Sequence, residues 1–90
     1  MFSIGDYLDA VSENIEGDEI ISRARELLGS LPIELLEQDF EDAGSIAFDM
    51  MLEENEEFAD TDSIDMREFM YWDEGAEAIL GVIEVMAEDY

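Results

Sequence analysis

Carboxylates are the abundant reactive groups of this sequence, and many of them recur at helical spacing. The chain has 90 residues, with 27 Asp and Glu against three Arg and no Lys, His or Cys, so its formal net charge is −24. Carboxylate pairs can act as acid and base, but only where their environments push the two pKa values apart. Without His or Lys, a serine nucleophile has no ordinary base, and without His or Cys a metal loses its commonest ligands. The composition therefore disfavours nucleophilic catalysis and transition-metal sites.

One segment invites a test for calcium binding. SIDMREF, at Ser63 to Phe69, looks like the second half of an EF-hand loop. Aligning Glu68 with the closing Glu of that loop places Ala59 at a ligand position and Asp62 where Gly is required. Phosphate-binding glycine loops are absent from the sequence as well. We therefore expect no metal, no cofactor and no enzymatic activity.

The net charge points to a basic partner. A surface this negative repels nucleic acid and anionic membranes once they come within a Debye length of about 8 to 10 Å. Duplex DNA carries one charge per roughly 1.7 Å, so 24 charges correspond to about 40 Å of duplex. A compact domain of this length is about 30 Å across. The protein therefore presents negative charge at nearly the density of DNA.

The carboxylates expected to contact a basic partner form rows along the predicted helices. Neighbours three or four residues apart on a helix lie about 5 to 6 Å from one another, near the spacing of successive phosphates on a strand. The main row is Asp49, Glu53, Glu56, Glu57 and Asp60, the second is Glu34, Glu37 and Glu41, and the third is Asp6, Asp9, Glu13 and Glu16.

Helices must position these rows. The apolar periodicity predicts helices over residues 4–16, 19–28, 31–42, 46–58 and 73–88, with a short helix within 66–72. Ser3, Asp18 and Ser30 are the expected N-caps of the first three helices, with Asp6 completing a capping box in the first, and Gly29 is the expected C-cap of the second. Gly44 and Ser45 permit either a stop or a kinked continuous helix.

The last helix, Asp73 to Glu88, is apolar on most of its circumference and is predicted to be buried on nearly every side. The fold class predicted for residues 1–90 is a single all-α domain, a compact bundle of four to six short helices around this buried C-terminal helix. The alternative is an α+β fold with a short strand near Phe69 to Trp72. No export signal or bilayer-spanning apolar run is present, which favours a cytoplasmic protein.

The Met and aromatic side chains are expected to fill the core, as a small domain needs them for burial. The Met residues in this expectation are Met50, Met51, Met66, Met70 and Met86. Phe69, Tyr71 and Trp72 form the densest aromatic patch of the chain. An exposed Tyr71 or Trp72 would instead indicate a partner or self-association site.

Two stretches carry a family resemblance. SIAFDMMLEE at Ser45 to Glu54, followed by FMYWDEGAEAIL at Phe69 to Leu80, resembles the closing region of ArdA-type antirestriction proteins. In that family an acidic helix precedes an aromatic-acidic segment of the type Tyr-Ile-Asp-Tyr-Glu-x-x-Ala. The corresponding residues here are Phe69, Met70, Tyr71, Trp72, Asp73 and Ala76, and the match covers less than half of the chain. In size and charge the chain is also similar to phage-encoded DNA mimics, including anti-CRISPR proteins. The resemblance implies a stoichiometric inhibitor that occupies a DNA-binding groove.

The leading hypothesis is therefore a DNA mimic. Its partner would be the basic groove of a DNA- or RNA-binding protein, such as a restriction-modification enzyme or a CRISPR effector in the host cytoplasm. Direct nucleic-acid and membrane binding are not expected, and homodimerisation stays open. The alternatives are an immunity protein that neutralises a basic nuclease toxin and a generic acidic protein of a high-salt organism.

Overall fold

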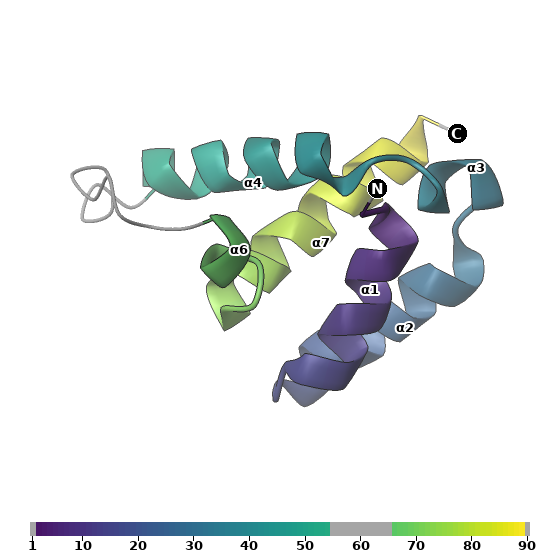
Figure 1. The fold of residues 1–90 in the computed structure, drawn as a ribbon, viewed down its shortest axis with the longest axis horizontal. Coiled ribbons are helices and arrows are strands. Elements are labelled where there is room, and N and C mark those ends of the chain that lie inside the picture. Colours follow the sequence, from purple (N-terminus) through teal and green to yellow (C-terminus); the bar gives the residue numbers. More distant parts are fainter. Residues whose placement is uncertain (1, 55–65, 90) are drawn as a thin grey trace.

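The computed structural model describes residues 2–54 and 66–89, and these ranges are helical through most of their length (Figure 1). The helices are α1 (Ile4–Asn14), α2 (Asp18–Ser30), α3 (Ile33–Leu36), α4 (Phe40–Glu54), α6 (Met66–Phe69) and α7 (Asp73–Glu88). The described residues contain no strand, only an isolated bridge between Ser3 and Asp39. The all-α fold is confirmed. The alternative strand near Phe69 to Trp72 is wrong, because α6 and a turn occupy that stretch.

Helix α1 begins as its sequence predicts. The Ser3 hydroxyl accepts the Asp6 N–H at 3.1 Å, and the Asp6 carboxylate accepts the Ser3 N–H at 3.1 Å, which completes a capping box. The helix ends at Asn14, earlier than predicted, because Ile15 turns to extended backbone (φ −103°, ψ 138°) and buries its side chain.

Helix α2 differs from its prediction at both ends. Gly17 is the N-cap, and Asp18 is the first helical residue. The negative charge of Asp18 still stabilises the helix there, because it lies at the positive end of the helix dipole. Gly29 lies inside the helix and is no C-cap. The helix ends after Ser30 because Leu31 precedes Pro32, and a residue before proline is driven out of helical backbone (φ −77°, ψ 147°).

The single helix predicted over residues 31–42 differs at its start and is interrupted by the N-terminus of the chain. Ser30 is the last residue of α2, so it is no N-cap, and Pro32 takes that position before α3. The Ile4 N–H donates to the Gln38 carbonyl at 3.0 Å, and the Phe40 N–H donates to the Phe2 carbonyl at 2.9 Å. This pairing needs extended backbone at Asp39, so α3 stops and α4 starts anew. The Asp39 carboxylate then accepts the Glu41 N–H at 3.1 Å, as an N-cap side chain does.

Helix α4 continues through the predicted stop. Gly44 and Ser45 lie within it, and Gly44 is buried beside Ala43. The small side chains of this turn therefore face the core, and of the two alternatives the continuous helix is the one adopted. No described glycine has a positive φ.

The helices pack as two pairs that meet over a shared core. Helices α1 and α2 form a hairpin, while α4 lies along α7, with α6 against both of them (Figure 1). Tyr7 stacks on Phe40 with ring centroids 4.3 Å apart, and Phe48 meets Phe69 edge to face at 5.2 Å. The molecule measures 37 × 27 × 23 Å. The core collects buried side chains from all six of the described helices.

Helix α7 is less enclosed than its sequence predicts. Its buried residues are Gly75, Ala76, Ile79, Leu80, Val82 and Ile83, all on one broad face. Val85, however, is 63% exposed, and a Cβ built on Gly81 would meet no atom within 4 Å. A domain of 90 residues has too few segments to cover a helix on every side. One face of α7 is therefore left open.

The buried Tyr7 hydroxyl makes a long-range link that can be tested. It donates to the Met70 carbonyl at 3.1 Å, and burial raises the pKa of Tyr7 well above its ordinary value. Tyr7→Phe should lower the free energy of unfolding by about 1 to 2 kcal/mol, because the buried carbonyl loses its donor. Urea unfolding followed by circular dichroism measures this change.

The exposed Tyr71 provides the control for this substitution, and Tyr71→Phe should change stability by less than about 0.5 kcal/mol. A raised tyrosine pKa contributes stability that is present below about pH 10 and is lost as the pH rises above it. The alkaline loss should be smaller in Tyr7→Phe. Equal stability losses in the two variants would show that the Tyr7 hydrogen bond contributes nothing.

Candidate functional site

The row on α1 is largely assembled as predicted. Asp6, Asp9 and Glu13 are exposed on the face opposite the buried side of the helix. Glu16 is exposed too, but it lies beyond the end of α1 and leaves the helical register. Asp6 also serves in the capping box, so part of its carboxylate is already bonded to the backbone.

The second row is not one helical stripe. Glu34 lies in α3, Glu37 is the C-cap of α3, and Glu41 lies in the first turn of α4. All three are exposed, but the extended backbone at Asp39 separates the first two from the third. The predicted single helix face is therefore wrong here, because the N-terminal residues pair with the chain between α3 and α4.

The main row is present on α4 as far as the structure describes it. Asp49 and Glu53 are exposed and one turn apart, on the side away from the buried Ala47 and Met51. Asp42, also exposed, lies on the same stripe two turns before Asp49 and extends it toward the start of the helix. The remaining members of the predicted row, Glu56, Glu57 and Asp60, lie outside the described residues.

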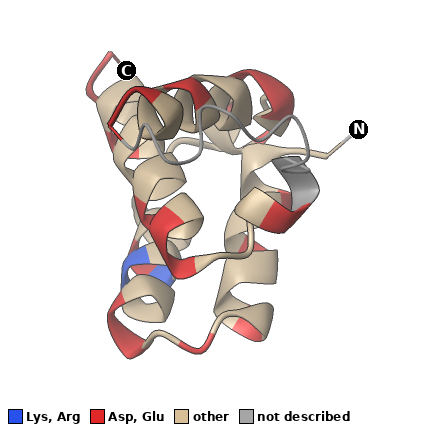
Figure 2. Cartoon of the chain, turned by 90° about the vertical axis from the view of Figure 1, so that its left-hand side faces the viewer, with Lys and Arg blue, Asp and Glu red and all other residues tan. Residues whose placement is uncertain are grey.

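One of the few cations is committed to an ion pair between α2 and α7. Arg23 donates from Nε and Nη2 to the two Glu84 carboxylate oxygens, at 2.5 and 2.7 Å. These hydrogen bonds lower the pKa of Glu84 and raise that of Arg23. Acidic residues are distributed over the helices around it (Figure 2). Because Glu84 neutralises Arg23, one of the few positive charges of the chain is not available to an outside partner.

The contribution of this pair can be separated from the effect of charge alone. Arg23→Gln and Arg25→Gln remove the same charge from the same helix, but only Arg23 makes the ion pair. Because both partners are more than one-third exposed, solvent screens the interaction. Arg23→Gln should therefore be only about 0.5 kcal/mol less stable than Arg25→Gln in chemical denaturation. Equal stabilities would show that the pair has no net effect.

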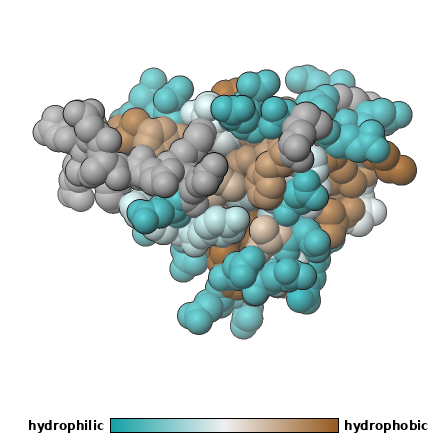
Figure 3. Space-filling view, in the orientation of Figure 1, coloured by the Kyte–Doolittle hydropathy of each residue, from teal (hydrophilic) through white to brown (hydrophobic). Residues whose placement is uncertain are grey.

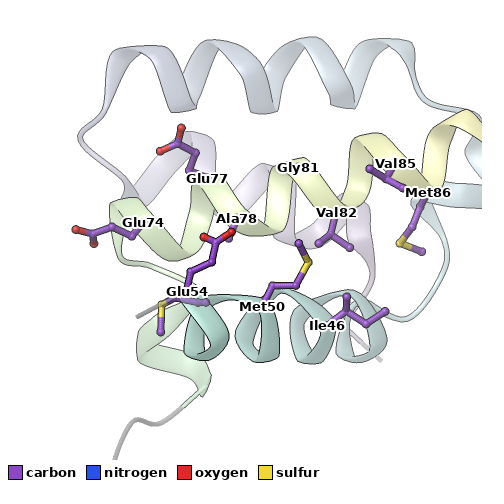
Figure 4. Close-up of a pocket in the computed structure, with 11 residues that line it drawn as sticks. Ile46, Met50, Glu54, Glu74, Glu77, Ala78, Gly81, Val82, Val85 and Met86 are labelled. Carbon is purple, nitrogen blue, oxygen red and sulfur yellow. The ribbon is translucent and has the colours of Figure 1, made fainter. Parts of the chain in front are cut away.

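A groove between α4 and α7 is the second feature of the surface. It has a volume of about 720 Å³, and its lining residues are Ile46, Met50, Met51, Glu54, Glu74, Glu77, Ala78, Gly81, Val82, Val85 and Met86. The two helices run antiparallel, so the end of α4 lies beside the start of α7 (Figure 4). Glu54 and Glu74 thus lie toward one end of the groove, and Ile46 and Val85 lie toward the other.

Helical spacing places these side chains. Ile46, Met50 and Glu54 are four residues apart and form one stripe of α4. Glu74, Ala78, Gly81 and Val85 form the facing stripe of α7 at spacings of four, three and four. Met50 is 50% exposed, so the prediction that it is buried in the core is wrong, and the same holds for Val85 at 63%. Both lie at the edge of an apolar helix face, where sequence periodicity does not distinguish core from surface.

The other Met and aromatic residues follow the prediction in part. Met51 and Met70 are buried, and Met86 is partly buried against the core. The side chain of Met66 lies outside the described residues. Phe69 is fully buried, whereas Tyr71 is exposed in the turn between α6 and α7. This exposure is the feature expected of a partner-contact residue.

The described carboxylates are all surface groups. None is buried, and no three of the Asp and Glu side chains in residues 2–54 and 66–89 are arranged to hold a metal ion. No described helix has the length and apolar character that crossing a bilayer requires.

The candidate site thus has two parts, the acidic faces of α1 and α4 and the groove between α4 and α7. Comparison of the chain with protein-family models, with curated protein sequences and with solved structures gives no match.

Proposed function

We propose that this protein is a DNA mimic that inhibits a nucleic-acid enzyme by occupying its basic groove. The observation that supports it best is the density of fixed charge. A net charge of −24 is carried on a molecule whose longest dimension is 37 Å. The same number of charges on duplex DNA spans about 40 Å. A groove that binds DNA would therefore meet a comparable number of negative groups over a comparable length.

The way in which acids are placed on the helices supports a role in binding. The last turns of α1, α2 and α7 contain no basic residue, and those of α1 and α7 contain Glu13 and Glu88. A carboxylate at the negative end of a helix dipole costs about 0.3 to 1 kcal/mol. A surface composed for fold stability would place Lys or Arg there. The acidic surface is therefore maintained at the expense of helix stability.

The mechanism follows from electrostatics. The field of the acidic surface attracts a basic groove over the Debye length, which accelerates association at low salt. Helix α4 then presents Asp42, Asp49 and Glu53 in fixed positions, and α1 presents Asp9 and Glu13. Because the helices are already folded, little conformational entropy is lost on binding. The resemblance to ArdA-type antirestriction proteins suggests restriction-modification enzymes as targets, and the charge and size suggest CRISPR effectors.

Competition with DNA tests the proposal. Purified type I restriction enzymes and Cas9-type effectors would be loaded with a fluorescein-labelled duplex of about 20 base pairs in about 50 mM salt, and then titrated with the protein. We expect displacement of the duplex from at least one of these enzymes, with one protein bound per basic groove. Enzymes that keep their duplex throughout would contradict the proposal. Tight binding to a nuclease toxin without competition by DNA would indicate an immunity protein, and folding only in molar salt would indicate a high-salt protein.

A further inference from the structure

We infer that the groove between α4 and α7 docks an amphipathic basic segment of the protein's partner, with apolar side chains in the groove and Lys or Arg at its acidic end. This inference rests on the proposed function, because it assigns a second contact to the same basic partner.

The apolar side chains of the groove are exposed to a degree that suggests a bound partner covers them. Ile46, Met50 and Val85 are 51%, 50% and 63% exposed on a surface otherwise dominated by carboxylates. Apolar side chains that gather at one place on a charged surface commonly mark a binding site. In the space-filling view, hydrophobic residues lie in separate areas between the hydrophilic ones (Figure 3). The volume of about 720 Å³ is within the range of ligand pockets, about 300 to 1,000 Å³.

The floor and walls suit side chains that enter from outside. Gly81 lines the groove without a side chain, and a Cβ there would meet nothing within 4 Å, so free space remains beside this turn of α7. Met50 and Met86 line the walls, and their flexible thioether chains adapt to the shape of an inserted group. The groove can therefore accept branched or aromatic side chains without movement of the helices.

Charge at one end of the groove selects the occupant. Glu54 and Glu74 lie toward the end of the groove where the end of α4 meets the start of α7, whereas the Glu77 side chain points away from α4 (Figure 4). A segment that fills the apolar end and continues past Glu54 and Glu74 is favoured if it carries Lys or Arg there. Nucleic acid would be repelled, and so would a second copy of a chain with a net charge of −24.

The dimensions fit a helix. From Ile46 to Glu54 the stripe on α4 covers nine residues, or about 12 Å of helix. A helix that lies in the groove would therefore place apolar residues at i, i+3 or i+4, and i+7, with basic residues in the following turn. DNA has no apolar side chain to offer a protein groove of this kind. The contact would thus add selectivity for one partner, and it would persist at salt concentrations that screen the carboxylate rows.

A designed peptide provides the probe. It would be a fluorescein-labelled helix of about 16 residues with leucines at i, i+3, i+4 and i+7 and lysines elsewhere. A control peptide would carry serine in place of each leucine. Binding would be measured by fluorescence anisotropy in about 0.5 M salt, where exposed charges are largely screened. We expect the leucine peptide to bind with a Kd below about 50 µM and the serine peptide to bind at least tenfold more weakly.

Variants of the protein locate the site. Met50→Ser and Val85→Ser, both at exposed positions, should each raise the Kd of the leucine peptide about tenfold. Ile33→Ser is the matched control, because Ile33 is 71% exposed on α3 and does not line the groove. It should change the Kd less than about twofold. Far-ultraviolet circular dichroism would verify that all three variants remain folded.

The inference would be overturned by any of three results: equal binding of the leucine and serine peptides, a loss with Ile33→Ser as large as with Val85→Ser, or sedimentation at the mass of a dimer that Val85→Ser dissociates. The last result would make a second copy the occupant. The test is separable from that of the proposed function. A protein that displaces duplex DNA but binds no leucine peptide refutes the groove contact alone, whereas one that binds the peptide but displaces no duplex refutes the DNA mimic.

Discussion

Gly75→Ala is expected to lower the free energy of unfolding by about 3 kcal/mol, the largest loss we predict for a single methyl group in this chain. A Cβ at Gly75 would lie 1.8 Å from the Phe69 carbonyl oxygen and 2.8 Å from its carbonyl carbon. These are backbone atoms, so α6 would have to move away from the first turn of α7. Phe69 is fully buried against Phe48, and this displacement would also disrupt the core.

The same substitution at Gly81 is the control. It lies in the same helix, but a Cβ there meets no atom within 4 Å. Gly81→Ala should therefore stabilise the protein by about 0.5 to 1 kcal/mol, the usual gain in helix propensity. Urea unfolding of both variants gives the comparison. The expected signs are opposite, and a stabilising Gly75→Ala would show that α6 does not approach α7 this closely.

The second large effect is the salt dependence of partner binding. A protein that replaces six to ten phosphate contacts should lose about 10³-fold or more in affinity between about 50 and 200 mM salt. The rows provide this many carboxylates only in combination, so no single Glu→Gln change should abolish binding. Affinity measured at several salt concentrations against the enzyme identified by duplex displacement provides the slope. An affinity unchanged across this range would exclude the carboxylate rows as the principal contact.

Charge reversal then identifies the row that makes contact. Asp49→Lys with Glu53→Lys on α4, and Asp9→Lys with Glu13→Lys on α1, change the net charge equally and at the same spacing. We expect the α4 pair to weaken binding about 100-fold at low salt and the α1 pair to weaken it less, since α4 carries the main row and would make the larger share of the direct contacts. Equal losses from the two pairs would mean that net charge, and no particular face, determines affinity.

Local sequence rules predicted part of the fold well. The capping box of Ser3 and Asp6 and both ends of α7 are as expected, because caps and apolar periodicity act within one or two turns. The interruption at Asp39 was not predicted, since it depends on pairing with Phe2 and Ile4 far away in the chain. A local signal for the new helix was present, however: Asp39 followed by Asp42 has the spacing of a capping box.

The candidate site, too, was predicted from the sequence only in part. The exposed rows on α1 and α4 follow from periodicity, because charged residues at helical spacing face water wherever the helix packs. The prediction that the second row forms one helix face was wrong, because its members belong to two helices. The groove was missed because Met50 and Val85 look like core residues in sequence.

The amino-acid sequence by itself determined the helical class of this protein, the start of α1, the limits of α7 and a surface dominated by carboxylates, since each depends on composition or on neighbours within a few residues. Only the tertiary structure decided where the chain between α3 and α4 breaks and which apolar side chains of α4 and α7 stay exposed. The physical reason is coverage. An apolar side chain is buried only if another segment packs over it, and a chain of 90 residues cannot cover every apolar face of its helices.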